Sequence, residues 1–189
     1  MNLYGKIVKL RSVEEEDLEM LRELTNDPSF EKMIVGWSFP VSKKDQYEWF
    51  DSCKNGLDRL RYVIETENDG PVGMIGLKDI DWKNGVATGL GMRVAKKELR
   101  TKGIATDAWM TLMRYSFEEL RLNRINGSAI EYNAASLRVC EKVGFKIEGT
   151  QREAVYKNGK YWDVISMACL KSDYYELIKD NNYWGENNE

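Results

Sequence analysis

The order of hydrophobic and polar positions along the chain predicts strands and helices over most of its length. Alternating apolar and polar residues are typical of a half-buried strand, and apolar residues spaced three and four apart are typical of an amphipathic helix. By these criteria a strand and two helices come first, three strands follow, and a helix, a strand and a helix lead to a final pair of strands. The predicted strands are residues 6–13, 61–66, 72–81, 86–94, 124–132 and the two arms of a hairpin within 145–171, and the predicted helices follow residues 12 and 42 and cover about 103–121 and 134–143.

Helix-start and turn signals lie between these segments. Ser12 with Glu15, and Ser42 with Asp45, have the spacing of a capping box, which satisfies backbone amides at the start of a helix. The Asn-Gly pair at 84–85 favours a tight hairpin turn between the two strands beside it. The local chemistry of the chain therefore agrees with the segmentation at several of its boundaries.

The resulting order, β-α-α-β-β-β-α-β-α-β-β, predicts one mixed α/β (α+β) domain with helices around a central sheet. A chain of 189 residues is long enough to bury a core of its own. We expect this domain to span residues 1–178, and we expect residues 179–189 to form a polar C-terminal tail.

Composition and charge narrow the functional classes. The net charge is −3 and the isoelectric point is near 5.3, so bulk charge does not favour a nucleic-acid partner. No apolar run approaches the roughly 18 residues of a membrane span, and we expect no signal peptide. Cys53, Cys140 and Cys169 are odd in number and widely scattered, which favours free thiols in a reducing, cytoplasmic environment.

The absence of histidine restricts the chemistry further. It excludes Ser-His-Asp and Cys-His nucleophile systems and histidine-bearing zinc sites. Three isolated cysteines without a Cys-x-x-Cys pair also argue against a structural zinc site, so we expect no metal. Catalysis must then depend on carboxylates, Tyr, Cys, Lys, Ser, backbone amides or a bound cofactor.

The segment ELRTKGIATDAWMTLMRYSF (98–117) places Arg100, Lys102 and Gly103 at the start of a predicted helix. The first amides of a helix lack intrahelical acceptors and carry a partial positive charge, so they suit an anion. Gly103 removes the side chain that would block close approach, and the two cations add positive charge. The segment therefore favours a pyrophosphate site, and the alternative interpretation is a solvated helix start without a ligand.

The segment RTKGIATDA (100–108), followed by NAASLRVCEKVGF (133–145), resembles the motif pair of the GCN5-related N-acetyltransferases, or GNAT family. The final hairpin, EGTQREAVYKNGKYWDVISM, is similar to the subgroup that includes ribosomal-protein alanine and serine N-acetyltransferases. The resemblance covers roughly residues 5–175. It implies a single GNAT-type domain with a central, mostly antiparallel sheet, acetyl-CoA as cofactor, and transfer of an acetyl group to a primary amine.

The resemblance also implies a cofactor site, residue by residue. Backbone groups of residues 92–94 would pair with the pantetheine arm, and the amides of residues 102–106, with the Arg100 side chain, would hold the pyrophosphate. The Asn133 side chain would bond to the pantetheine arm, and its alternative role is a plain helix N-cap. The implied cofactor-binding residues are Met92, Arg93, Val94, Arg100, Thr101, Lys102, Gly103, Ile104, Ala105, Thr106, Asn133 and Ser136.

The catalytic residues depart from the family pattern. Many members have a tyrosine acid where this chain has Cys140, so Ser136 is the expected acid for the departing thiolate. Related sequences often have a glutamate where this chain has Thr88, and Glu131 is the expected base for the ammonium proton. The alternatives for the base are Asp79, Asp81, Glu153 and a water chain.

The acceptor is expected to be a small-molecule or peptide amine. Aromatic side chains near the expected acceptor cleft make Trp37, Phe39 and Tyr156 the expected substrate-binding residues. A small amine or polyamine, an amino sugar and a protein N terminus remain open as acceptors. The alternative function is a non-catalytic CoA-binding module. A nucleic-acid or membrane partner is not expected, and a homodimer is expected only by analogy with the family.

Overall fold

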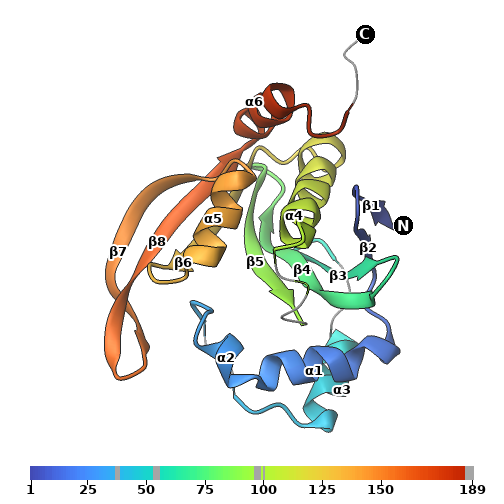
Figure 1. Cartoon of the computed structure of the whole chain (residues 1–189), viewed down its shortest axis with the longest axis vertical. Coiled ribbons are helices and arrows are strands. Elements are labelled where there is room, and N and C mark those ends of the chain that lie inside the picture. Colours follow the sequence, from blue (N-terminus) through green and yellow to red (C-terminus); the bar gives the residue numbers. More distant parts are fainter. Residues whose placement is uncertain (37–38, 53–55, 96–98, 100, 186–189) are drawn as a thin grey trace.

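The computed structural model describes residues 1–36, 39–52, 56–95, 99 and 101–185, which form an eight-stranded sheet flanked by helices (Figure 1). The strand order is β1-β2-β3-β4-β5-β6-β8-β7. Neighbouring strands are antiparallel except β5 and β6, which are parallel. The strands are β1 (Leu3–Tyr4), β2 (Lys9–Arg11), β3 (Arg59–Thr66), β4 (Gly70–Asp81), β5 (Val86–Val94), β6 (Arg124–Ile130), β7 (Lys146–Lys157) and β8 (Lys160–Leu170).

The helices lie around this sheet, with α4 and α5 in front of it and α1–α3 near the carboxyl end of β5 in Figure 1. A 3-10 turn, η1, precedes α1, and a π-helical turn, η3, continues α4. In the described part of the chain no helix is long and apolar enough to cross a membrane. The helices are η1 (Glu15–Asp17), α1 (Leu18–Asn26), α2 (Pro28–Glu31), α3 (Lys43–Ser52), α4 (Ile104–Arg114), η3 (Tyr115–Glu119), α5 (Ala134–Lys142) and α6 (Lys171–Asn181).

The predicted fold class, a mixed α/β domain around a central and mostly antiparallel sheet, is confirmed. The capping box at Ser42 is also confirmed, because the Ser42 amide donates to the Asp45 carboxylate at 3.0 Å and the Asp45 amide donates to the Ser42 hydroxyl at 3.1 Å. The cap predicted at Ser12 is wrong. The helical region begins with η1, where the carboxylate of Asp17 accepts the amide of Glu14 at 2.9 Å.

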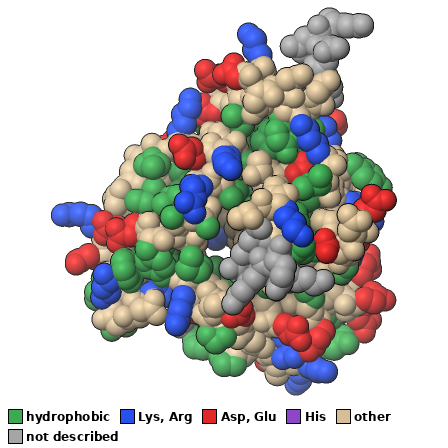
Figure 2. Space-filling model, in the orientation of Figure 1, with side chains coloured by type: hydrophobic (Ala, Val, Ile, Leu, Met, Phe, Trp, Pro, Cys, Tyr) green, Lys and Arg blue, Asp and Glu red, His purple; other side chains and the backbone are tan. Residues whose placement is uncertain are grey.

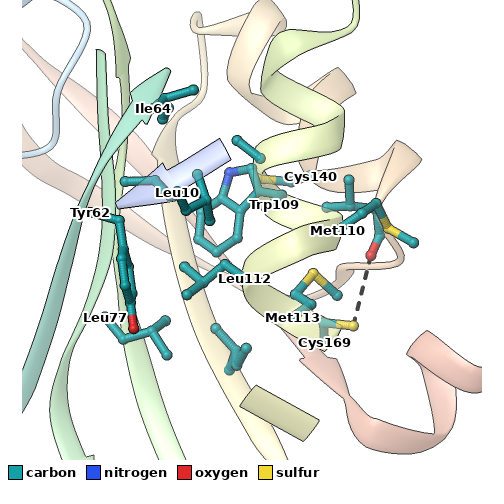
Figure 3. Packing of buried hydrophobic residues seen from close by; sticks show 14 of the residues in the cluster. Leu10, Tyr62, Ile64, Leu77, Trp109, Met110, Leu112, Met113, Cys140 and Cys169 are labelled. Carbon is teal, nitrogen blue, oxygen red and sulfur yellow. Dashed lines mark hydrogen bonds between the residues drawn. The ribbon is translucent and has the colours of Figure 1, made fainter. Parts of the chain in front are cut away.

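The two faces of the central strands bury different side chains. The register places Tyr62, Ile75 and Met92 opposite one another in β3, β4 and β5. This face packs against α4, as Figure 3 shows for Tyr62 and Leu77 beside the α4 side chains. Successive side chains of a strand point to opposite faces, so the next row, which ends with Arg93, lies on the side away from α4.

Asp107, in the first turn of α4, is buried and accepts hydrogen bonds from distant parts of the chain. Its carboxylate accepts the amides of Lys6 at 3.0 Å, Ile7 at 2.7 Å and Val8 at 3.0 Å, and the hydroxyl of Tyr183 at 2.8 Å. Burial and this last hydrogen bond raise the pKa of Tyr183. Asp107 therefore joins α4 to the N-terminal turn and to the segment after α6.

These bonds account for two differences from the predicted elements. Of the strand predicted at 6–13 only Lys9–Arg11 forms a strand, β2, because the amides of residues 6–8 turn toward Asp107 instead of toward a strand; β1 lies before the predicted range. The helix α6 was not among the predicted elements. Tyr183 and Trp184, in the segment that the sequence separates as a tail, pack against the core.

Two buried thiols predict a loss of stability at alkaline pH. Burial raises the pKa of Cys140 to about 11 and that of Cys169 to about 12, from an ordinary value of 9.0. Because the folded state holds these protons more tightly, their stabilising contribution is complete below pH 9 and is lost as the pH rises toward 11–12. Above pH 9 the free energy of unfolding should fall by about 1.4 kcal/mol per pH unit for each thiol.

Urea unfolding between pH 8 and pH 11 measures this slope, and the Cys140→Ala/Cys169→Ala double variant supplies the comparison. The double variant is less stable at neutral pH, since it creates two cavities. Its stability should nevertheless change less steeply with pH. Equal slopes for the two proteins would contradict the assignment of the pH dependence to these thiols.

Candidate functional site

The parallel strands β5 and β6 pair over only three residues and then separate. Val86–Thr88 pairs with Arg124–Asn126, and from Gly89 to Val94 the same edge of β5 has no strand partner among the described residues. The opposite edge stays paired with β4 as far as Val94. The edge of β5 from Gly89 to Val94 therefore offers an extended ligand backbone donors and acceptors that no described strand uses.

The separation begins where the Trp109 side chain of α4 lies against β5. A Cβ atom on Gly89 would lie 2.7 Å from the Trp109 ring, so the indole occupies the space that a side chain would need. Just beyond, Leu90 and Gly91 together oppose Gly76 of β4, which is a β-bulge, and Gly91 has a φ of 78°. A bulge bends a strand and increases its twist, so it turns the free edge of β5 away from β6.

The start of α4 provides a second set of free amides. Gly103 is the N-cap residue, with a φ of 82° and no side chain to cap the helix. The first amide bonded within α4 is that of Asp107, which donates to the Gly103 carbonyl at 2.9 Å. In the described segment, 101–185, the amides of residues 104–106 have no such partner, so they carry the partial positive charge of a helix N terminus.

These features suit the predicted cofactor. The free edge of β5 contains Met92, Arg93 and Val94, and α4 begins beyond the loop that follows them. Because helices that follow parallel strands begin at the carboxyl ends of those strands, α4 and α5 start at the same edge of the sheet. An extended pantetheine arm along β5 would end with its pyrophosphate at the first turn of α4.

The predicted pyrophosphate residues have different environments. Thr101, Lys102 and Gly103 are exposed in the turn before α4, and Thr101 has a φ of 70°. The Ile104 side chain is buried, so only the backbone of this residue is available to a ligand. Arg100 lies outside the described residues. Ala105 and Thr106 complete the first turn of the helix and are half-buried.

Asn133 is the N-cap of α5, as one of its two predicted roles requires. Its side-chain oxygen accepts the amide of Ser136 at 3.1 Å, and its nitrogen donates to the Met33 carbonyl at 2.9 Å. Ser136 lies one turn before Cys140 on α5. Burial raises the pKa of Cys140, and a hydrogen bond with Ser136 lowers it by a smaller amount. The pantetheine contact of Asn133 and the acid role of Ser136 stay predictions.

Glu131 lies at the end of β6, with its side chain exposed. Its carboxylate accepts the amide of Asp163 at 3.2 Å, and its own amide donates to the Asp163 carbonyl at 3.0 Å. Among the alternatives, Asp81 accepts two hydrogen bonds from Asn84 in the β4–β5 turn. The role of Glu131 as a base stays a prediction.

The loop after α2 is fixed by a lysine that sequence reasoning missed. Lys157, at the end of β7, is 6% exposed and forms an ion pair with Glu31. Its ammonium also donates to the carbonyls of Glu31 at 3.1 Å and Gly36 at 2.8 Å. No sequence pattern identifies this contact, since its partners are more than 100 positions apart in the chain.

Two further side chains bind the same loop. The Tyr132 hydroxyl donates to the Lys32 carbonyl, and the Asn133 nitrogen donates to the Met33 carbonyl. Donors from β7 and from the junction of β6 and α5 therefore bind the carbonyls of Glu31, Lys32, Met33 and Gly36. A bonded loop of this kind makes a firm wall for a ligand site.

This wall borders a cavity of about 390 Å³. Tyr156, one of the predicted substrate-binding residues, lines it and packs edge-to-face on Tyr161 at 5.1 Å. Phe39 is exposed, and Trp37 lies outside the described residues. The cavity is lined by Glu31, Val35, Gly36, Ala154, Val155, Tyr156 and Lys157.

The visible surface carries both signs of charge. On the face shown in Figure 2, Lys and Arg side chains are interspersed with Asp and Glu and are not gathered into one basic patch. A surface that follows a nucleic-acid backbone needs a continuous basic stripe. This face therefore offers no support for such a partner.

Comparison with known proteins identifies relatives along most of the chain. A family model described as "Acetyltransferase (GNAT) domain" matches residues 8–146. The SPbeta prophage-derived uncharacterized N-acetyltransferase YokL of Bacillus subtilis is 29% identical over 171 residues, which cover 90% of this chain and 93% of that protein. The putative ribosomal N-acetyltransferase YdaF of Bacillus subtilis is 40% identical over 102 residues, or 54% of this chain and 55% of that protein.

A solved structure shows the same fold. The spermidine N-acetyltransferase from Vibrio cholerae, solved in complex with CoA and spermine, superposes with a TM-score of 0.82. Its sequence is 24% identical, and the superposition covers 90% of this chain and 99% of that chain.

Proposed function

The chain belongs to the GNAT acetyltransferase family, and we propose that it acetylates the primary amine of a small molecule by direct attack of the amine on acetyl-CoA. Acetyl-CoA-dependent N-acetyl transfer is the activity to which its family and relatives point. The observation that carries the proposal is the edge of β5 from Gly89 to Val94 together with the amides at the start of α4, both without a backbone partner among the described residues.

The residues have separable roles in this reaction. Acetyl-CoA supplies an acyl group that is already activated as a thioester. The amides of residues 102–106, with the Arg100 side chain, hold the pyrophosphate, and the edge of β5 at 92–94 orients the pantetheine arm and polarises the carbonyl. Ser136 donates a proton to the departing thiolate, and Glu131 accepts the proton of the attacking amine.

The cavity beside the loop at residues 32–36 favours a small acceptor. Its volume of about 390 Å³ lies in the range of small-molecule sites. The spermine in the Vibrio cholerae structure supports a polyamine as one acceptor, and an amino sugar is the other small-molecule class. The partial match to YdaF supports the ribosomal-protein subgroup and hence a protein N terminus as the competing acceptor. The homodimer and the cytoplasmic location stay predictions.

Thiol release from acetyl-CoA, followed with a chromogenic thiol reagent, tests this function. The panel contains polyamines, amino sugars, amino acids and short N-terminal peptides, and a control without acceptor corrects for the three cysteines of the chain. We expect saturable turnover with a small amine and a loss of kcat in Ser136→Ala and Glu131→Gln. Binding of CoA without turnover on any amine would favour the non-catalytic module instead, and turnover restricted to peptides would exclude a small acceptor.

A further inference from the structure

Arg93 lies on the face of β5 that α4 does not cover. Its neighbours Met92 and Val94 pack against the core on the α4 side, so the Arg93 side chain points to the opposite face, toward α1 and α2. There its guanidinium donates to the hydroxyl of Thr25, near the end of α1, at 3.2 Å. The guanidinium carbon also lies 5.8 Å from the centre of the Phe30 ring on α2.

Arg93 is half-buried, and none of the ion pairs formed among the described residues includes it. A guanidinium has five N–H donors, and the Thr25 hydroxyl accepts one of them. Burial lowers the pKa of Arg93. Arg11 is a contrasting case, because it is also half-buried but binds Asp17 through two hydrogen bonds and Glu65 through a third.

A half-buried cation without a negative partner opposes folding, because it loses water and gains no opposite charge. The flat guanidinium matches the two oxygens of a carboxylate or a phosphate, and the pair is strengthened where water is excluded. Charged groups held at such a cost are concentrated at functional sites. The Arg93 donors that no described residue accepts therefore suit an anion that arrives with a ligand.

We propose that Arg93 binds a carboxylate or phosphate group carried by the acceptor amine, an inference that rests on the proposed acetyl transfer. The phosphates of acetyl-CoA are assigned to the start of α4, and α4 covers the opposite face of β5. The acceptor approaches from the side of α1 and α2. It is then an amine that also carries a negative charge, such as an amino acid or a phosphorylated amino sugar, and a polyamine is disfavoured by repulsion from Arg93.

Matched pairs of acceptors test this assignment. Alanine is compared with alaninamide, and glucosamine 6-phosphate with glucosamine, while spermidine represents the polycations. The two pairs distinguish a carboxylate from a phosphate as the bound anion. We expect the wild-type protein to prefer the anionic member of one pair by about 100-fold in kcat/KM, and Arg93→Gln to abolish that preference. Arg93→Lys should retain part of it, because the charge remains and the fork is lost.

A matched control is Arg22→Gln. Arg22 lies on α1, and its guanidinium already binds Glu19, so its replacement should leave the preference between acceptors unchanged. The melting temperature without ligands gives an independent readout. A purely structural role of Arg93 predicts a lower melting temperature for Arg93→Gln, whereas a ligand-binding role predicts no decrease, because the charge removed has no carboxylate partner among the described residues.

Two results would overturn the inference. A preference for spermidine, or for the neutral member of both pairs, would overturn the role of Arg93 in binding an anion. It would leave the proposed acetyl transfer intact. An anionic preference that survives in Arg93→Gln would do the same. Binding of acetyl-CoA with no turnover of any amine would instead contradict the proposed function, and this inference with it.

Discussion

Replacement of Gly103 by valine is expected to weaken acetyl-CoA binding about 100-fold. Gly103 has a φ of 82°, a region in which a β-branched residue is strained, so valine would move the turn that presents the first amides of α4. An effect of this size is about 2.7 kcal/mol, which corresponds to the loss of one or two charge-assisted hydrogen bonds of about 1.5–3 kcal/mol each. Isothermal titration with CoA measures the dissociation constant, and urea unfolding measures the accompanying loss of stability, expected to be about 2 kcal/mol.

Gly70→Val separates the two effects. Gly70 has a φ of 65° at the start of β4, directly after the turn from β3, and a Cβ atom there would meet no other atom within 4 Å. The backbone strain is therefore similar, but the position is remote from the free edge of β5. We expect a similar loss of stability and unchanged CoA binding. Equal weakening of CoA binding in both variants would attribute the effect to lost stability, and normal binding by Gly103→Val would remove the pyrophosphate from this turn.

The fold was largely predictable because local patterns specify it. Alternation identified the strands from β3 to β8, and each is long enough, or close enough to a turn signal, to read without its partners. The region before residue 12 was misread because its backbone bonds to Asp107, about one hundred positions away, and no local pattern records such a contact. The helix α6 was also missing from the predicted elements. It begins at Lys171, directly after the last residue of β8, so no turn signal separates the two elements.

The candidate site likewise contains features that local sequence signals predict and features that only the assembled fold shows. Helix starts and glycines are local signals, so the amides at Gly103 and the bulge near Gly91 could be expected from the chain itself. The Lys157 contacts and the surroundings of the Arg93 guanidinium depend on which strands and helices become neighbours. Alternation places Arg93 on one face of a strand. Only the assembled sheet shows that this face meets α1 and α2. It also shows that no carboxylate among the described residues pairs with the Arg93 guanidinium.

Asp107→Ala is expected to lower the free energy of unfolding by about 4 kcal/mol. The alanine would leave the amides of residues 6–8 and the Tyr183 hydroxyl without their acceptor, at a place where Asp107 and Val8 are buried. Domains of this kind are stable by about 5–15 kcal/mol in total, so the loss would be a large part of the whole. Urea unfolding at neutral pH measures it, and Asp107→Asn should be intermediate, because an amide oxygen retains part of the acceptor capacity.

Asp81→Ala is the matched control for an aspartate that accepts hydrogen bonds. Asp81 binds the backbone and side chain of Asn84 in an exposed turn, so its loss should cost less than about 1 kcal/mol. A similarly small loss for Asp107→Ala would show that the N-terminal turn does not depend on this carboxylate. Tyr183→Phe removes one of the four donors, and a loss near 1 kcal/mol would show that the segment after α6 contributes to the same unit. Because the carboxylate lies in the first turn of α4, its loss should also weaken CoA binding through the amides that precede it, whereas Asp81→Ala should not.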